Sequence, residues 1–423
     1  MAGTQASAET QTQRSAAAAI DPGAFPEQLR SIAAKVLQGV RLDEADALTC
    51  LTTPHLVHLG RLADTVRRRL NGNVTYFNVN RHINPTNVCV YTYNCKFCSF
   101  AALQGEAHAW QMSHEEVYAH ARDQGGNEVT EFHIVGGLHP DLSLDWYLEM
   151  LRGLKERFPQ AHLKAFTAIE IGWFAKREKL SLEEVLRRLR DAGLGSLPGG
   201  GAEIFHPEVR EIICDGKLDA DEWIEVHRVA HGMGIKSNCT MLYGHVERPE
   251  HKVDHLLRLR ALQDETGGFN AFIPLAYHPE NNYMGLKYHT TGQDDLRHIA
   301  ASRLVLDNIP HIKAYWVMVT PKLAQVALRF GADDMDGTIV EEKIYHMAGA
   351  GTAQQLSRAE LERIVREAGF VPVERDTLYR PVGKTALEAP GKTVLNAPGP
   401  APALPLSDAA SANPAAAPAA ATV

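Results

Sequence analysis

Strand-like and helix-like segments alternate along most of this 423-residue chain, and this alternation limits the folds open to it. Apolar, β-branched and aromatic residues are concentrated in eight short runs, at 74–80, 129–137, 163–171, 194–201, 236–245, 269–278, 312–320 and, more weakly, 333–338. Apolar residues recur every three or four positions at 113–124, 144–158, 181–193, 219–234, 253–268, 294–308, 321–331 and 357–370. Such alternation predicts a parallel sheet covered by helices.

Eight strand–helix units over roughly 300 residues predict an α/β fold, a (β/α)8 TIM-type barrel. An open doubly wound sheet is the competing architecture. We favour the barrel because glycine and polar residues collect just after the expected strands, where the mouth of a barrel brings such residues together. Capping boxes are expected at helix starts, for Ser113 with Glu116, Ser181 with Glu184 and Ser357 with Glu360.

Composition separates the two ends of the chain from this region. Residues 1–22 are mostly small and polar, and residues 385–423 are rich in Pro and Ala, so both tails are predicted to be disordered. Residues 23–72 predict a short helical region that leads into the barrel domain at 73–384.

Charge and hydropathy narrow the possible partners and location. No apolar run approaches the about 18 residues that indicate a membrane span, and no signal peptide is recognisable, so a cytoplasmic protein is expected. The net charge of -8 argues against binding nucleic acid.

Three of the six cysteines lie within ten residues, in the segment NVCVYTYNCKFCSF that follows the first expected strand. In a reducing compartment, thiols so close together indicate metal ligands and not disulfides. Cys89, Cys95 and Cys98 suit a four-iron, four-sulfur cluster with one iron left open, since a purely electron-carrying cluster takes four cysteines. An open iron can bind the methionine part of S-adenosylmethionine (SAM), whose cleavage gives a 5′-deoxyadenosyl radical.

Other interpretations of these thiols remain. A structural zinc site could use the same three thiolates with His82 as a fourth ligand, and CKFC alone could be a redox dithiol. Neither explains why the thiols follow the first strand. Cys50, Cys214 and Cys239 stand alone and are expected to be small buried hydrophobes.

Glycines and polar residues follow the other expected strands. Gly136 and Gly137 allow the backbone to approach a ligand closely, and their carbonyls could accept hydrogen bonds from an ammonium group. The polar residues at the expected mouth are Arg81, His139, Glu170, Glu203, Tyr243, His245, Glu247, His278, Glu280 and Asn281. Carboxylates there could bind ribose hydroxyls, and imidazoles could bind carboxylates or move protons. Each could equally be a satisfied polar group of the rim.

These segments resemble the aminodeoxyfutalosine synthases, a family of radical SAM enzymes on the futalosine route to menaquinone. The likeness spans residues 70–380 and is carried by RHINPTNVCV, CKFCSF, HIVGGLHPDL, LKAFTAIEI, LPGGGAEIF, TMLYGHVE and the run from LLRLRALQDETGG to LAYHPENN. The family spaces its cluster cysteines C-x3-C-x2-C, whereas this chain reads C-x5-C-x2-C, with two extra residues between Cys89 and Cys95.

The resemblance implies roles for some of the candidate residues. Cys89, Cys95 and Cys98 would bind the [4Fe-4S] cluster, Phe97 would pack near the adenine of the cofactor SAM, and Gly136 and Gly137 would take its methionine ammonium. Glu170 and Glu203 are assigned to the nucleoside of SAM from strand order. Arg81, Tyr243 and Glu247 are assigned to substrate binding, and His139, His245 and His278 to catalysis. An aryl ether substrate needs a dry apolar wall, for which Phe272, Tyr277, Tyr315 and Trp316 are available.

The resemblance also implies the reaction. The radical would add to 3-[(1-carboxyvinyl)oxy]benzoate, and rearrangement with loss of carbon dioxide or bicarbonate would give 6-amino-6-deoxyfutalosine and methionine. SAM would be consumed, and a low-potential donor such as flavodoxin or ferredoxin would supply the electron. Two alternatives stay open: a cyclase like cyclic dehypoxanthinyl futalosine synthase, and a zinc-stabilised barrel that binds a ligand without redox chemistry.

Overall fold

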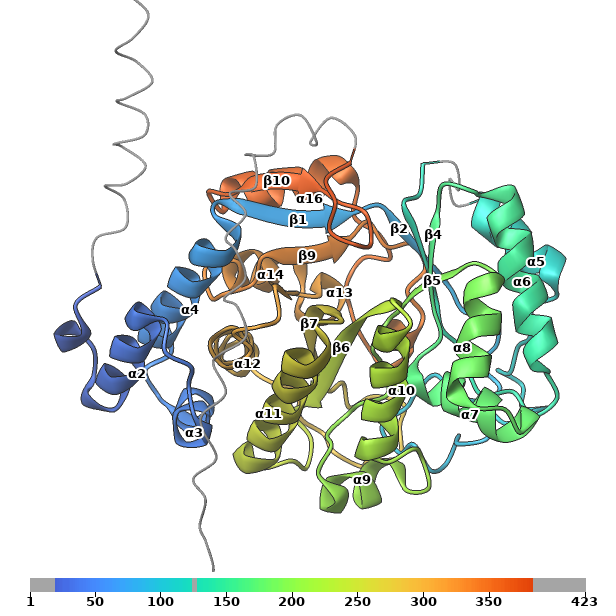
Figure 1. The fold of residues 1–423 in the computed structure, drawn as a ribbon, viewed down its shortest axis with the longest axis horizontal. Helices are drawn as coiled ribbons and strands as arrows, with labels where there is room; N and C mark the ends of the chain where they lie inside the picture. Colours follow the sequence, from blue (N-terminus) through green and yellow to red (C-terminus); the bar gives the residue numbers. More distant parts are fainter. Residues whose placement is uncertain (1–19, 124–127, 383–423) are drawn as a thin grey trace, which may run out of the picture. The chain divides into compact units, whose positions relative to one another are not determined.

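The computed structural model describes residues 20–123 and 128–382, and its main sheet has seven parallel strands (Figure 1). In sheet order, which is also chain order, they are β2 (Asn80–Ile83), β3 (Glu131–Ile134), β4 (His162–Ala165), β5 (Leu194–Leu197), β6 (Lys236–Tyr243), β7 (Phe269–Ala276) and β8 (His311–Ile312). Sequential parallel neighbours joined by helices form a curled half-barrel, which confirms the expected α/β fold class. The tails predicted to be disordered lie, apart from residues 20–22, outside the described residues.

A second, three-stranded sheet corrects the count of eight equivalent strands. Its order is β10 (Val371–Glu374), β1 (Val74–Asn78), β9 (Asp334–Gly337). The first expected run is therefore split between β1 and β2, and the weak run at 333–338 is β9. A single bridge, Lys313 to Asp334, links the end of β8 to β9. Strand β10 was not predicted, and its Pro372 is tolerated because β10 is an edge strand.

Helices cover the outside of the strands. Their bounds are α5 (His114–Asp123), α6 (Leu144–Arg157), α7 (Ala168–Glu178), α8 (Leu182–Asp191), α9 (Pro207–Cys214), α10 (Ala220–Gly232), α11 (Pro249–Thr266), α12 (Gly292–Val305), α13 (Trp316–Val319), α14 (Pro321–Ala327), α15 (Ile344–Met347) and α16 (Arg358–Glu367). Figure 1 shows α10 and α11 lying against β6 and β7. No helix in these two ranges is long and apolar enough to cross a membrane.

Two of the expected strand runs end early in helices. After Ala165, Thr167 begins a capping box with Glu170, so the second half of 163–171 starts α7. After Ile312, the run 312–320 turns into α13, whose four residues are all buried. A run that is apolar on every side has no periodicity by which a strand could be told from a helix.

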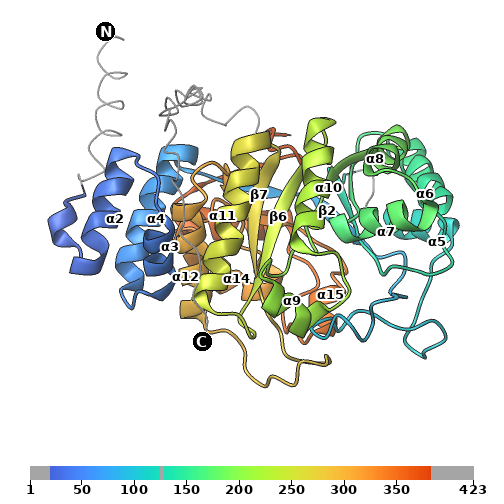
Figure 2. The same cartoon turned by 60° about the horizontal axis from the view of Figure 1, so that its bottom comes forward.

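The N-terminal helices pack on the barrel helices. They are a short 3-10 turn η1 (Pro22–Ala24), α2 (Glu27–Gln38), α3 (Glu44–Thr52) and α4 (Leu56–Asn71). Helices α3 and α4 contact α12, and α3 also contacts α11 (Figure 2). The predicted capping boxes of Ser113 and Ser357 are present, whereas Ser181 caps Glu184 without the reciprocal bond, because the Glu184 carboxylate pairs with Arg187 and Arg188.

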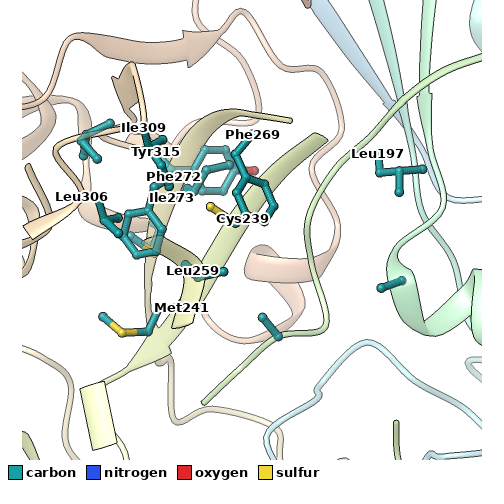
Figure 3. Packing of buried hydrophobic residues seen from close by; sticks show 14 of the residues in the cluster. Leu197, Cys239, Met241, Leu259, Phe269, Phe272, Ile273, Leu306, Ile309 and Tyr315 are labelled. Atoms are coloured by element: carbon teal, nitrogen blue, oxygen red, sulfur yellow. The ribbon is translucent and has the colours of Figure 1, made fainter. Parts of the chain in front are cut away.

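The buried core includes Cys50, Cys214 and Cys239. Cys239 on β6 lies with Phe269 and Phe272 of β7 and is fully buried (Figure 3). Cys50 and Cys214 are buried as well, which confirms the prediction that these thiols behave as small hydrophobes. Strand β6 therefore has an outward face, carrying Cys239 and Met241, and an inward face that is left for the barrel interior.

Candidate active site

A cavity of about 320 Å³ lies at the carboxyl ends of the strands of the main sheet. Nine of the predicted site residues line it: Cys89, Cys95, Phe97, Cys98, Gly136, Gly137, Glu170, Glu203 and His278. They come from the loops after β2 to β5 and after β7, which the fold brings to one mouth. Tyr277 and Tyr315 of the expected apolar wall line the cavity too, whereas Phe272 and Trp316 do not.

Backbone hydrogen bonds hold the thiol loop between β2 and α5. The Cys89 N–H donates to the Ala102 carbonyl at 2.9 Å, and the Cys98 N–H donates to the Cys95 carbonyl at 3.0 Å. Asn87 braces the loop, since its Nδ2 donates to the carbonyls of Phe100 and His108. The three sulfurs are therefore placed by the loop's own backbone.

The spacing of the three sulfurs suits a cluster better than a single zinc ion. Only two groups of three or more potential ligands within 4.8 Å of one another occur in residues 20–123 and 128–382, and neither contains Cys89, Cys95 and Cys98. At least one pair of these Sγ atoms is thus farther apart than the about 4.6 Å that two thiolates on one zinc allow at 2.3 Å each. Thiolates that bind different irons of one cluster have no such limit.

Burial raises the pKa of all three thiols, and Lys217 acts in the opposite direction. Each thiol is consequently protonated at neutral pH until iron displaces the proton, as for any thiolate ligand. Three thiols at the wall of one cavity, with further polar groups opposite them, fit a [4Fe-4S] cluster.

The Gly136–Gly137 pair packs against the thiol loop. The Gly137 N–H donates to the Thr86 carbonyl at 2.8 Å, and a Cβ at Gly137 would lie 2.3 Å from the carbonyl oxygen of Val88. Glycine is required here because backbone approaches backbone. The close approach expected of this pair is therefore made to the thiol loop, while both residues also line the cavity.

Glu170 is buried at the cavity wall, and its oxygens have protein partners. Oε2 accepts from the N–H and the hydroxyl of Thr167, at 2.7 and 2.9 Å, and Oε1 accepts from the Gly136 N–H at 3.2 Å. Burial raises the pKa of Glu170 to about 7 against the effect of these donors. Its position joins the start of α7 to the glycine pair.

Glu203 pairs with a lysine that the sequence did not indicate. Lys217 Nζ lies 2.5 Å from Glu203 Oε1 and 5.4 Å from the centre of the Phe97 ring, and both side chains of the ion pair are 8% exposed. Burial opposes the charge on Lys217, but the Glu203 carboxylate raises its pKa above the ordinary value. Lys217 is a lone cation between α9 and α10, without a motif to reveal it.

Tyr243, His245 and Glu247, which were expected at the mouth, are not among the residues that line the cavity. Tyr243 is on the outward face of β6, where its hydroxyl donates to Asp295 Oδ1 at 2.8 Å. Glu247 accepts from the backbone N–H groups of Gly244 and His245, each at 2.8 Å, so its carboxylate closes the turn after β6. Burial lowers the pKa of His245, whose Nε2 bonds the Leu242 carbonyl.

Arg81 and His139 also lie away from the cavity walls. Arg81 Nη1 donates to the Asn80 carbonyl and to Thr338 Oγ1 beside β9. His139 is 2% exposed, and its Nδ1 accepts from the Asp141 N–H at 3.0 Å. Both side chains therefore stabilise loops of the barrel in this structure.

Several cavity residues were not predicted as site residues. Besides Lys217, the walls include Tyr91, His133, Thr240, Asp336, Glu342 and Tyr345, and also His82, considered above only as a zinc ligand. His82 stacks on His133 with ring centres 4.6 Å apart. Tyr345 belongs to the segment around α15, a region without any recognisable signature.

A parallel α/β half-barrel with three thiols on the loop after the first strand of its main sheet is the arrangement of radical SAM enzymes. The model of the radical SAM superfamily matches residues 83–259, and that of the CofH/MqnC C-terminal region matches residues 266–386. The chain belongs to the radical SAM superfamily. Enzymes of this superfamily use a [4Fe-4S] cluster and SAM.

The chain aligns with nearly the whole length of several relatives. The aminodeoxyfutalosine synthase of Thermus thermophilus is 48% identical over 366 residues, which are 86% of this chain and 96% of that protein. The 5-amino-6-(D-ribitylamino)uracil–L-tyrosine 4-hydroxyphenyl transferase of Methanopyrus kandleri is 43% identical over 81% of this chain and 94% of that one. Methylornithine synthase (PylB) shares the fold, with a TM-score of 0.64 at 17% identity, over 81% and 97% of the two chains.

Proposed function

We propose that this protein is a transferase that joins the 5′-deoxyadenosyl group of SAM to 3-[(1-carboxyvinyl)oxy]benzoate and forms 6-amino-6-deoxyfutalosine for menaquinone biosynthesis. The observation that carries the proposal is the 48% identity to the Thermus synthase over 96% of its length. When bound, the cluster supplies the electron that cleaves SAM to the adenosyl radical. A low-potential flavodoxin or ferredoxin in the cytoplasm would deliver that electron.

The protein's own residues would bind the reactants and exclude water. Cys89, Cys95 and Cys98 would hold the cluster, and Phe97 would pack beside the adenosyl group. Gly136, Gly137, Glu170 and Glu203 would contribute polar contacts to SAM.

The wall opposite the thiol loop suits the aryl ether. Tyr277, Tyr315 and Tyr345 line the cavity together with Ile273 and Leu275 of β7. Burial in such a wall excludes water that would quench a reactive species. Lys217 is a cavity residue suited to one of the substrate carboxylates.

A second candidate function is transfer of the 4-hydroxyphenyl group of tyrosine, because the Methanopyrus relative is 43% identical. Anaerobic, reconstituted and reduced protein should be incubated with SAM and either the vinyl ether or the aminouracil with tyrosine. Mass spectrometry should find an adenosyl adduct with the vinyl ether only. Accumulation of 5′-deoxyadenosine without an adduct would exclude the proposed reaction, and a coupled aminouracil product would establish the second candidate.

A further inference from the structure

Three potential metal ligands converge on the loop after β7, at the edge of the cavity. One ligand atom each of His278, Glu280 and His289 lies within 4.8 Å of the others. Glu280 Oε1 is 2.7 Å from His289 Nε2, and the two imidazole rings are 5.7 Å apart between centres. His278 also lines the cavity, so this group joins the cavity wall to the outer loop.

The tautomer of His278 leaves a lone pair available. Its Nε2 is 3.3 Å from the carbonyl oxygen of Met318, which can only accept, so Nε2 carries the proton. Nδ1 is buried and has no hydrogen-bond partner among the described residues. A ring nitrogen held by a carbonyl, with the other nitrogen free, is the arrangement usual for metal-binding histidines.

The Glu280 side chain is 40% exposed, and one of its two carboxylate oxygens has no hydrogen-bond partner in the described part of the chain. Its Oε2 is buried and lacks a hydrogen-bond partner within 20–123 and 128–382. The carboxylate sits against Gly349, where an added Cβ would come within 2.6 Å of Oε2. The Glu280 carbonyl accepts from Ser99 Oγ at 2.7 Å, which anchors this loop to the thiol loop. A buried carboxylate oxygen without a donor is costly unless a cation or a donor satisfies it.

We propose that His278, Glu280 and His289 bind a divalent transition metal ion, zinc by preference, at the edge of the cavity. Two imidazoles and one carboxylate are ligands that Zn²⁺ takes, and three protein ligands leave a fourth position open. Because His278 belongs to the cavity wall, that position is suited to a carboxylate oxygen of a bound reactant. The site is separate from the three thiols and does not depend on the reaction proposed above.

A second group of the same composition provides an internal contrast. His206, Glu208 and His251 also come within 4.8 Å of one another. His206 Nδ1 and His251 Nε2 also lack hydrogen-bond partners among the described residues, so the contrast depends on the tautomer. The backbone N–H of Arg248 donates to His251 Nδ1 at 3.2 Å, so the proton of the neutral ring is on Nε2, the nitrogen that faces Glu208. Arg248 Nη2 is also 3.7 Å from Glu208 Oε2 and competes with a metal ion for the carboxylate.

The test measures zinc on the cluster-loaded protein. Protein with a reconstituted cluster is treated with a chelator, equilibrated with one equivalent of ZnCl₂, desalted and analysed for zinc and iron. We expect one zinc per chain for the wild type and for His251→Ala, and loss of the zinc in Glu280→Gln and His289→Ala. Iron content and circular dichroism should be the same in all four proteins.

X-ray absorption at the zinc edge identifies the ligands. Nitrogen and oxygen neighbours at about 2.0–2.1 Å, without sulfur at about 2.3 Å, would agree with the proposed site. Zinc that is retained by Glu280→Gln and His289→Ala, sulfur in the first shell, or a wild type without zinc would overturn it. None of these measurements needs turnover, so the proposed reaction and the zinc site are tested separately.

Discussion

Polar groups differ between the interior of the barrel and the cavity above it: in the interior, charged side chains are paired with opposite charges, whereas some polar groups of the cavity have no partner among the described residues. In the interior, three cations meet three carboxylates: Lys164 lies 2.5 Å from Glu131, Lys313 lies 3.4 Å from Asp336, and Arg375 lies 2.6 Å from Asp334. We call these six residues the interior network. Burial alone would raise the pKa of Glu131, but Lys164, Lys313 and Arg375 hold it below its ordinary value. Charge here is balanced within the protein.

The cavity contains buried polar groups that have no hydrogen-bond partner within 20–123 and 128–382. Of the residues that line the cavity, His82 and His278 each have a buried ring nitrogen, Nε2 and Nδ1 respectively, without a hydrogen-bond partner among the described residues. The three thiols line the same space. Unsatisfied buried polar atoms are rare in folded proteins, because each costs about 1–3 kcal/mol. Glu131 Oε1 and Arg375 Nη2 of the interior network also lack hydrogen-bond partners in the described part of the chain, but each side chain has an oppositely charged partner within 2.6 Å, and Asp336 lines the cavity itself. We infer that the network serves mainly stability, whereas the neutral polar groups of the cavity are suited to groups that come from outside the chain.

Removing a cluster ligand should have the largest effect on function and little effect on the fold. For Cys95→Ala we expect iron to fall from about four per chain to near zero, with loss of all turnover. The melting temperature should change little, because the thiol is on a loop. Cys239→Ala, which removes a core thiol, is the matched control and should keep its iron. SAM cleavage retained by Cys95→Ala would show that Cys95 is not a ligand.

Removing one charge of the interior network should lower the stability of the fold. For Lys164→Met we expect a loss of about 3–5 kcal/mol of unfolding free energy, since Glu131 would stay buried and partly uncompensated. Denaturant unfolding of cluster-free protein measures this loss. The control Arg363→Met breaks the exposed pair with Glu367, at 2.9 Å, and should cost less than about 1 kcal/mol. Equal losses in both variants would contradict the distinction between the network and the surface.

The sequence predicted the architecture because alternation is a property of long segments. It failed where a segment is short or apolar on all sides. Residues 312–319 are all buried, so only the structure shows that β8 ends at Ile312. Strand β10 has four residues including a proline, too few for a pattern.

Candidate residues that line the cavity could be recognised from the sequence where they are close together in it. The thiols and the glycine pair each form a compact motif that follows a strand. Along β6 the prediction depended on which face a residue occupies: Thr240 and Leu242 face the cavity, so Tyr243 faces outward. Lys217 could not be recognised from the sequence, because its partner Glu203 is fourteen residues away and the two form no motif.

Crowding the contact between the glycine pair and the thiol loop should have an intermediate effect. In Gly137→Ala the new Cβ would overlap the Val88 carbonyl, which is 2.3 Å away, and displace the loop. We expect a loss of about 1–3 kcal/mol and faster loss of iron to a chelator. Gly232→Ala is the control: its added Cβ would have no neighbour within 4 Å, so this variant should lose iron at the wild-type rate. Equal rates for both variants would mean that the loop adapts to the extra methyl group.

The smallest effect concerns the segment around α15, which closes one wall of the cavity with Glu342, Ile344 and Tyr345. His346 Nδ1 lies 2.6 Å from the Glu342 carbonyl, and Nε2 lies 3.0 Å from the Thr352 carbonyl. Both nitrogens face acceptors, so the charged ring satisfies both contacts. The bond to the Glu342 carboxylate is the main reason that the pKa of His346 is raised to about 8.

A pKa raised by folding stabilises the charged form, so this contribution is complete below pH 6.5 and disappears as the pH rises through 8. After allowance for partial exposure, it amounts to about 1 kcal/mol. We expect the wild type to lose this stability between pH 6 and pH 9 relative to His346→Gln, in denaturant unfolding at both values. The exposed His108 provides the control, since His108→Gln should follow the wild type. If His346→Gln shows the wild-type pH dependence, the wall around α15 is held by packing and not by the charge of His346. In that case the two regions would differ, since the interior of the barrel contains ion pairs.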